Sequence, residues 1–192
     1  MLIGDKLIST TVAEILTLQG AKAHLNVAHD EDDTIIQAYM AEAVESFERE
    51  TGTILRNQTR DATYSQFPYR DDWLLLPSRP VISVISVSYY ATDGTLTVLS
   101  NCQSSVSSFQ GKVKPPVDET WPAYQASRSE PVIVRYVCGF TSATTVPKDI
   151  LGALRLMVAD RYENRGDEFK RTEAHPVAAA RIMGLHGFGS PA

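Results

Sequence analysis

The acidic run from His29 to Asp33 is the densest group of side chains in the sequence that could bind a metal ion. It offers an imidazole and four carboxylates in five consecutive residues. A helix–loop–helix calcium site also needs a Gly at its sixth position and a Glu at its twelfth, and this chain has neither. The run directly precedes a predicted helix, whose positive N-terminal end attracts carboxylates. We therefore interpret it as a helix start, and we expect no metal and no cofactor.

A second set of carboxylates lies within the predicted helices. Glu42, Glu45 and Glu48 fall on the polar side of one helix, and Glu163 lies on another. The set loosely resembles the carboxylates with which all-helical nucleotide pyrophosphohydrolases hold Mg²⁺. The ligand spacing on the second helix does not match such a site, so a solvated helix face explains these glutamates better. A metal-dependent nucleotide hydrolase is therefore kept as an alternative function.

The remaining motifs do not predict catalysis. The glycine-rich segment Gly184–Gly189 follows a predicted helix and lacks the GxGxxG order of phosphate-binding loops. The four histidines fall at unrelated spacings, and no Ser or Cys lies in a nucleophile motif such as GxSxG. The two cysteines, Cys102 and Cys138, have no CxxC spacing. We therefore expect a protein that is not an enzyme.

The composition indicates a globular chain of one domain, or of one domain with an appendage. The chain has 192 residues, 43% hydrophobic and 21% charged, and is too apolar for a disordered protein. Its apolar runs are far shorter than the roughly 18 residues of a membrane span, and Asp5 and Lys6 interrupt any signal-peptide core. The net charge of −5 argues against a protein whose main work is to bind nucleic-acid phosphates.

Apolar residues at helical spacing predict three helices that could position these side chains. One covers Leu18–Val27, with Thr17 as its N-cap. The clearest runs from about Asp33 to Glu50. The third begins at Pro147 and ends at Gly166. Because each of the two long helices has an apolar stripe that it cannot bury alone, we expect them to pack together as a core.

Between the long helices the pattern changes to short β segments separated by turn residues. Strands are predicted over Thr59–Phe67, Trp73–Leu76, Val81–Tyr90, Leu96–Leu99 and Val132–Tyr136. Val81–Tyr90 alternates only in part, which indicates cover on both faces over part of its length. Asp93-Gly94 predicts a two-residue hairpin turn. The polar, Pro-rich stretch from Asn101 to Glu130 is expected to be a loop with one or two short strands.

These elements predict an α+β fold, with a small helical bundle core, an inserted antiparallel β lobe and an extended C-terminal tail. We assign one domain to 1–166, with a helical core at 17–53 and 146–166 and a β-rich insertion at 54–140. An interaction tail at 167–192 follows it. The tail has too few apolar residues to belong to the core.

Aromatic residues of the β lobe allow a second alternative function, a free-standing module that binds a ligand. They are Trp73, Tyr89, Tyr90, Trp121 and Tyr124. Aromatic residues at such positions more often pack between strands or contact another subunit.

Several segments together resemble the head–tail connector (adaptor) proteins of tailed phages. In chain order they are Leu18–Val27, His29–Ile36, Thr51-Gly52, Leu76–Val81, Trp121-Pro122, Val134–Phe140, Val146-Pro147 and Tyr162–Arg165. Each is only a capped helix, a proline turn or a strand, but their order and spacing are more specific. The likeness covers about 16–165. The family commonly has a charged residue where Gly20 stands here, and it varies after Gly166.

The resemblance implies a structural protein of the virion, made in the host cytoplasm and located at the head–tail interface of a phage, prophage or gene transfer agent. Such adaptors form a homo-oligomeric ring, typically a dodecamer, beneath the portal protein. The ring extends the DNA channel and docks the stopper or tail-completion protein. The acidic balance agrees with this role, because carboxylates along a channel let DNA pass without binding it. Glu42, Glu45 and Glu48 are the candidate channel-lining residues.

The resemblance also implies that the C-terminal tail reaches the portal. The candidate portal-binding residues are Arg171, His175, Pro176, Val177, Arg181, Ile182, Met183, Leu185 and Phe188. We expect Pro176 to start a short helix that presents Ile182 and Leu185. Arg171 and Arg181 would pair with carboxylates of the portal.

Overall fold

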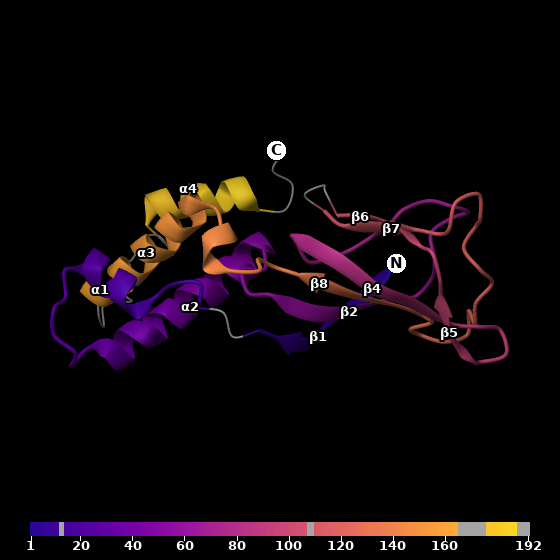
Figure 1. Cartoon of the computed structure of the whole chain (residues 1–192), viewed down its shortest axis with the longest axis horizontal. Helices are drawn as coiled ribbons and strands as arrows, with labels where there is room; N and C mark the ends of the chain where they lie inside the picture. Colours follow the sequence, from indigo (N-terminus) through magenta and orange to yellow (C-terminus); the bar gives the residue numbers. More distant parts are fainter. Residues whose placement is uncertain (12–13, 107–109, 165–175, 188–192) are drawn as a thin grey trace. The chain divides into compact units, whose positions relative to one another are not determined.

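The computed structural model describes residues 1–11, 14–106, 110–164 and 176–187, which form two compact units. The β unit consists of Met1–Val12 and Arg56–Phe140, and the helical unit of Ala13–Leu55 and Thr141–Ala192. In the described residues, the strands lie in the first unit and the helices in the second (Figure 1). The predicted α+β class is confirmed.

The first two helices begin and end at residues whose chemistry explains the boundaries. Helix α1 (Leu18–Leu25) starts at Thr17, whose hydroxyl accepts a hydrogen bond from the Gly20 N–H at 3.1 Å. It ends two residues before the predicted position. Helix α2 (Asp33–Thr51) ends at Gly52, which has a φ of +66° and donates its N–H to the Glu48 carbonyl at 2.9 Å.

The two long helices pack together, as predicted. Helix α3 (Lys148–Glu163) follows Pro147 and contacts α2 along its length. The buried apolar side chains of this pair are Ile36, Ala43, Val44, Phe47, Ile150, Ala153, Leu154, Met157 and Val158. The predicted end of α3 is wrong, because the helix stops at Glu163 and the Asn164 N–H closes its last turn on the Asp160 carbonyl at 3.1 Å. Gly166 lies outside the described residues.

The C-terminal segment also contributes to the helical core. Helix α4 (Val177–His186) starts after Pro176, as predicted, and packs against α3 and α2. Ala179 and Met183, one turn apart, are 0% and 5% exposed. The expectation of an extended tail too poor in apolar residues for the core is therefore wrong over this helix, because one small and one flexible side chain suffice to bury its face.

The β unit contains two antiparallel sheets. The larger has the order β1-β2-β8-β4-β5 and the smaller the order β3-β7-β6. The strands are β1 (Leu2–Thr10), β2 (Gln58–Tyr64), β3 (Leu74–Leu75), β4 (Val81–Tyr90), β5 (Leu96–Leu99), β6 (Gln103–Ser105), β7 (Lys112–Lys114) and β8 (Val132–Cys138). Apart from β1, each overlaps a segment predicted as strand or as loop with short strands, although β2 starts one residue before its predicted range and β8 ends two residues after it. Tyr136, Val134 and Val113 are among its fully buried side chains.

Strand β1 was not predicted, and its pairing with β2 explains why. Two register irregularities interrupt the ladder, between Leu2 and Gly4 and between Leu7 and Ser9, so the strand lacks a simple alternation. Its Asp5, unusual in an aliphatic strand, accepts hydrogen bonds from three side chains. The donors are Arg60 at 2.8 Å, Ser78 at 2.6 Å and Tyr136 at 2.9 Å.

The β4–β5 hairpin differs in one detail from the prediction. Cover on both faces of β4 holds over Ser86–Tyr90, where no residue is exposed, whereas Ile85 is 56% exposed and register irregularities break the alternation nearby. The connection is longer than two residues, because the Ala91 N–H bonds the Thr95 carbonyl at 2.8 Å and leaves a three-residue turn ending at Gly94. Gly94 has a φ of +86°, as such turns require.

Candidate functional site

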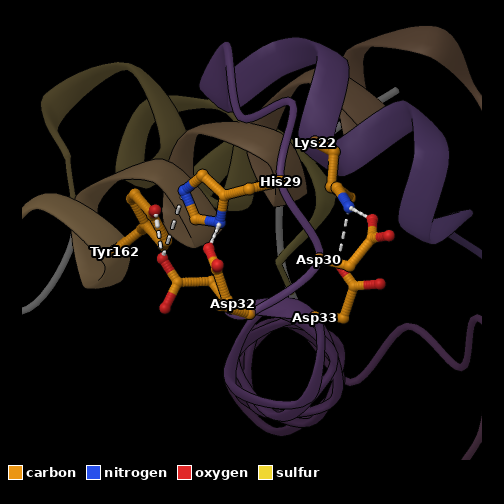
Figure 2. Close-up of polar contacts among 7 residues, drawn as sticks. Lys22, His29, Asp30, Asp32, Asp33 and Tyr162 are labelled. Carbon is orange, nitrogen blue, oxygen red and sulfur yellow. Dashed lines mark hydrogen bonds and ion pairs between the residues drawn. The ribbon is translucent and has the colours of Figure 1, made fainter.

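The acidic run joins α1, α2 and α3 through ion pairs and hydrogen bonds. Figure 2 shows the Lys22 ammonium reaching Asp30 and Asp33, at N–O distances of 2.6 and 2.7 Å. The Tyr162 hydroxyl of α3 donates to the Asp32 carboxylate at 2.6 Å, and His29 lies 4.0 Å from the same group (Figure 2). Each contact links residues from different helices or from the loop between α1 and α2.

This geometry corrects part of the helix-start interpretation. Asp32 stands at the N-cap of α2 but makes no capping hydrogen bond with its side chain, so its carboxylate serves the contact with α3 instead. Asp33 does lie in the first turn, where the helix dipole favours a carboxylate. The hydrogen bond from Lys22 lowers the pKa of Asp30 and raises that of Lys22 itself. The acidic run therefore joins the three helices through ion pairs and hydrogen bonds.

The three candidate channel glutamates have different surroundings. Glu42 lies 3.3 Å from the Arg161 guanidinium of α3, and its side chain is 57% exposed. Glu48 accepts a hydrogen bond from the Leu55 N–H at 2.7 Å and so fixes the chain after α2. Glu45 and Glu163 are exposed. Among the described residues, no group of three or more His, Cys, Asp or Glu side chains is arranged to hold a metal ion.

Three of the five candidate aromatic residues, Tyr89, Trp121 and Tyr124, pack around Phe67. The Phe67 and Trp121 rings stack with centroids 4.5 Å apart, while Tyr89 and Tyr124 meet Phe67 edge-on at 5.8 and 5.7 Å. The Trp121 indole N–H donates to the Asp72 carbonyl at 3.1 Å, and the residue is 9% exposed. These contacts are typical of internal packing.

The other two residues of the proposed ligand-binding set, Trp73 and Tyr90, face cations of the same unit. Lys112 and Lys114 lie 4.6 and 5.0 Å from the Trp73 ring, and Arg128 lies 3.5 Å from the Tyr90 ring. The aromatic residues that suggested a ligand-binding module are thus engaged in contacts within the β unit.

The candidate portal-binding residues on α4 divide between a buried and an exposed face. Met183 is buried and Ile182 partly so, whereas Val177 and Leu185 are 71% and 64% exposed. Arg181 is exposed and falls between them at a spacing of four residues. Val177, Arg181 and Leu185 therefore form one outward stripe. Arg171, His175 and Phe188 lie outside the described residues.

Contacts of His186, which we call the clasp, fix the C-terminal end of α4. The sequence did not predict them. The His186 ring lies 2.8 Å from the Asp149 carboxylate at the start of α3, and the Thr53 hydroxyl donates to the His186 carbonyl at 3.3 Å. The His186 and Phe47 rings lie 6.4 Å apart. The contact with His186 holds the pKa of Asp149 below its ordinary value. No local motif signals this clasp, because its members are distant in sequence.

The helices of the described residues include none long and apolar enough to cross a membrane.

No curated protein matches the chain. Among the solved structures that share this fold, three are chains of gene transfer agent particles with low sequence identity. A chain of the neck of an empty GTA particle computed with C6 symmetry and one of the virion of a native gene transfer agent (GTA) particle are each 17% identical, with a TM-score of 0.78. Each comparison covers 98% of this chain and all of the other.

A chain of the neck of a native GTA particle computed with C12 symmetry is 18% identical, with a TM-score of 0.72 and complete coverage of both chains. The fold is thus shared over nearly the whole length. The family model of phage gp6-like head–tail connector proteins matches residues 15–112, about half of the chain. This match agrees with the resemblance of the sequence motifs, and the chain therefore belongs to the phage gp6-like head–tail connector family.

Proposed function

We propose that the protein forms a dodecameric ring beneath the portal of a phage-like particle, where it extends the DNA channel and docks the next component of the neck. The observation that carries the proposal is the family match over residues 15–112 together with a fold shared over nearly the whole chain with neck proteins of gene transfer agents. One of those necks was computed with C12 symmetry, which supports twelve copies. The protein would then be part of the virion, at the head–tail interface.

The proposed role is structural and needs no catalysis. The hydrolase alternative would use Glu42, Glu45 and Glu163 as ligands, and of these Glu42 is paired with Arg161 at 3.3 Å. Of the three candidate channel residues, Glu45 is the most available to repel DNA phosphates, because Glu42 has a cation beside it and Glu48 caps a backbone N–H. DNA would pass without sequence-specific contacts.

We propose that α4 attaches the ring to the portal through its outward stripe, Val177, Arg181 and Leu185. The two aliphatic side chains offer apolar area, and Arg181 offers a guanidinium for a portal carboxylate. α4 carries no acidic residue, although the whole chain has a net charge of −5. The stripe therefore suits a groove that is apolar and has an acidic rim.

Removing the C-terminal segment would not test this attachment cleanly. A chain that ends at Ala174 loses the buried Ala179 and Met183, so it should uncover the α2–α3 pair and lose stability. Substitutions on the exposed stripe avoid this problem.

The experiment compares Val177→Ser plus Leu185→Ser with wild type in sedimentation with portal rings. Burial of an aliphatic side chain is worth roughly 1.5 to 3 kcal/mol, so the double variant should bind the portal at least about tenfold more weakly. Its thermal unfolding should stay near that of wild type. Val117→Ser, at a 68% exposed position of the β unit, is the matched control and should bind normally. Undiminished binding by the double variant would place attachment elsewhere.

A further inference from the structure

The larger sheet of the β unit ends in two edges with uncovered aliphatic side chains. β1 is one outer strand of the sheet and β5 the other. On β1, Leu2, Ile3, Leu7 and Ile8 are 42–47% exposed. On β5, Leu96 and Val98 are 52% and 60% exposed. Exposed aliphatic residues gathered at a sheet edge are typical of a contact surface.

The two edges differ in their protection against association. Natural edge strands are commonly guarded by charged side chains or prolines. β5 contains neither, and on β1 the Asp5 carboxylate is bound by Arg60, Ser78 and Tyr136 of its own unit. Lys6 is the one other charged residue of β1. β5 therefore presents apolar side chains without a charge, and β1 presents them beside the exposed Lys6 and two register irregularities.

The irregularities of β1 decide what kind of contact it can make. Ile3 and Ile8 fall at the two register irregularities between β1 and β2, so they stand outside the regular ladder. A strand interrupted in this way is a poor template for a long hydrogen-bonded extension of the sheet. It can still pack its side chains against another apolar surface.

The proposed ring gives these two edges a common partner. In a closed ring, each copy contacts its two neighbours through two different surfaces that fit each other. β1 and β5 are such a pair, because they lie at opposite ends of one five-stranded sheet, roughly 19 Å apart from strand spacing alone. A portal or a stopper would meet each copy along the ring axis, and this would not explain two similar surfaces at opposite ends of one sheet.

We propose that the β1 edge of each copy packs against the β5 edge of the next copy around the ring. The inference rests on the proposed ring and adds the surfaces that close it. Ile3, Leu7 and Ile8 of one copy meet Leu96 and Val98 of its neighbour. The occupant of each edge is therefore a second copy of this chain.

The test uses full-length Ile8→Glu and Val98→Glu, each mixed with portal rings and imaged by electron microscopy. A carboxylate buried in an apolar contact should weaken the neighbour contact by about 30-fold or more. Both variants should still bind portals through α4, but as scattered copies, where wild type gives complete rings. Val117→Glu, at an exposed position after β7 and outside both edge strands, is the matched control and should give complete rings.

Mixing the two variants gives a second, independent outcome. Ile8→Glu keeps an intact β5 edge and Val98→Glu an intact β1 edge, so an equimolar mixture should occupy portals in adjacent pairs. Complete rings from both single variants, or random occupancy by the mixture, would overturn the inference and leave the proposed function standing. A wild type that does not bind portals would instead contradict the proposed function. If a glutamate prevents folding, Ile3→Ser and Leu96→Ser test the same two edges.

Discussion

Phe47→Ala should remove a fully buried side chain of α2 that lies close to His186, the residue that fixes the end of α4. The Phe47 side chain is 0% exposed, and its ring lies 6.4 Å from that of His186. A buried aromatic side chain removes roughly 150 Å² or more from water, worth about 4 kcal/mol at 25 cal/mol per Å². A partly compact unfolded state reduces this value, and the cavity left by the ring adds to it. We expect a loss of about 3 to 5 kcal/mol in the free energy of unfolding.

The positions of the tryptophans allow the effect to be assigned to one unit. Trp73 and Trp121, the two tryptophans of the chain, both lie in the β unit, so their fluorescence follows that unit, whereas circular dichroism at 222 nm follows mainly the helices. In urea, Phe47→Ala should lower the midpoint of the dichroism transition by about 2 M. Leu185→Ala, at a 64% exposed position of the same unit, is the control and should shift it little. A midpoint equal to that of wild type would refute the packing of α2 described above.

Three further predictions concern other parts of the chain. A triple variant that combines Glu42→Gln, Glu45→Gln and Glu48→Gln should unfold thermally and bind the portal like wild type, because Gln can still accept the hydrogen bond at position 48. If wild type hydrolyses nucleotides and the triple variant does not, the hydrolase alternative is supported. The pKa of Asp149 lies below its unfolded value, so its stabilising effect is present above about pH 4 and is lost as pH falls through the folded pKa. Asp149→Asn should therefore lose less stability than wild type when urea unfolding is compared at pH 5 and pH 3, and an equal loss would argue against the clasp. Gly139→Ala should lower the free energy of unfolding of the β unit by about 2 kcal/mol or more, because φ at this position is +95° and an added Cβ would collide with the Arg56 carbonyl. Tryptophan fluorescence in urea measures the change, and unchanged stability would contradict this backbone geometry.

The elements that could be predicted from the sequence are those whose signals are local. The apolar stripe of α2, the Thr17 cap of α1 and the alternation of β8 each depend on residues close in sequence, and the structure has all three. Phe47 could be predicted as a core residue for the same reason.

The features that could not be predicted depend on contacts between distant residues. Strand β1 could not be predicted from local patterns, because its Asp5 is stabilised by side chains 55 to 131 residues away. The docking of α4 depends on Ala179 and Met183 meeting a surface made by two other helices, and its own composition does not reveal that surface. Likewise, the edges of the larger sheet become visible only when the order of its strands is known.

Electron microscopy of the wild-type protein mixed with its portal tests the proposed ring. We expect a closed ring of twelve copies coaxial with the portal, with an open channel along the axis. Portals that remain bare, or that carry isolated copies without contacts between neighbours, would contradict it.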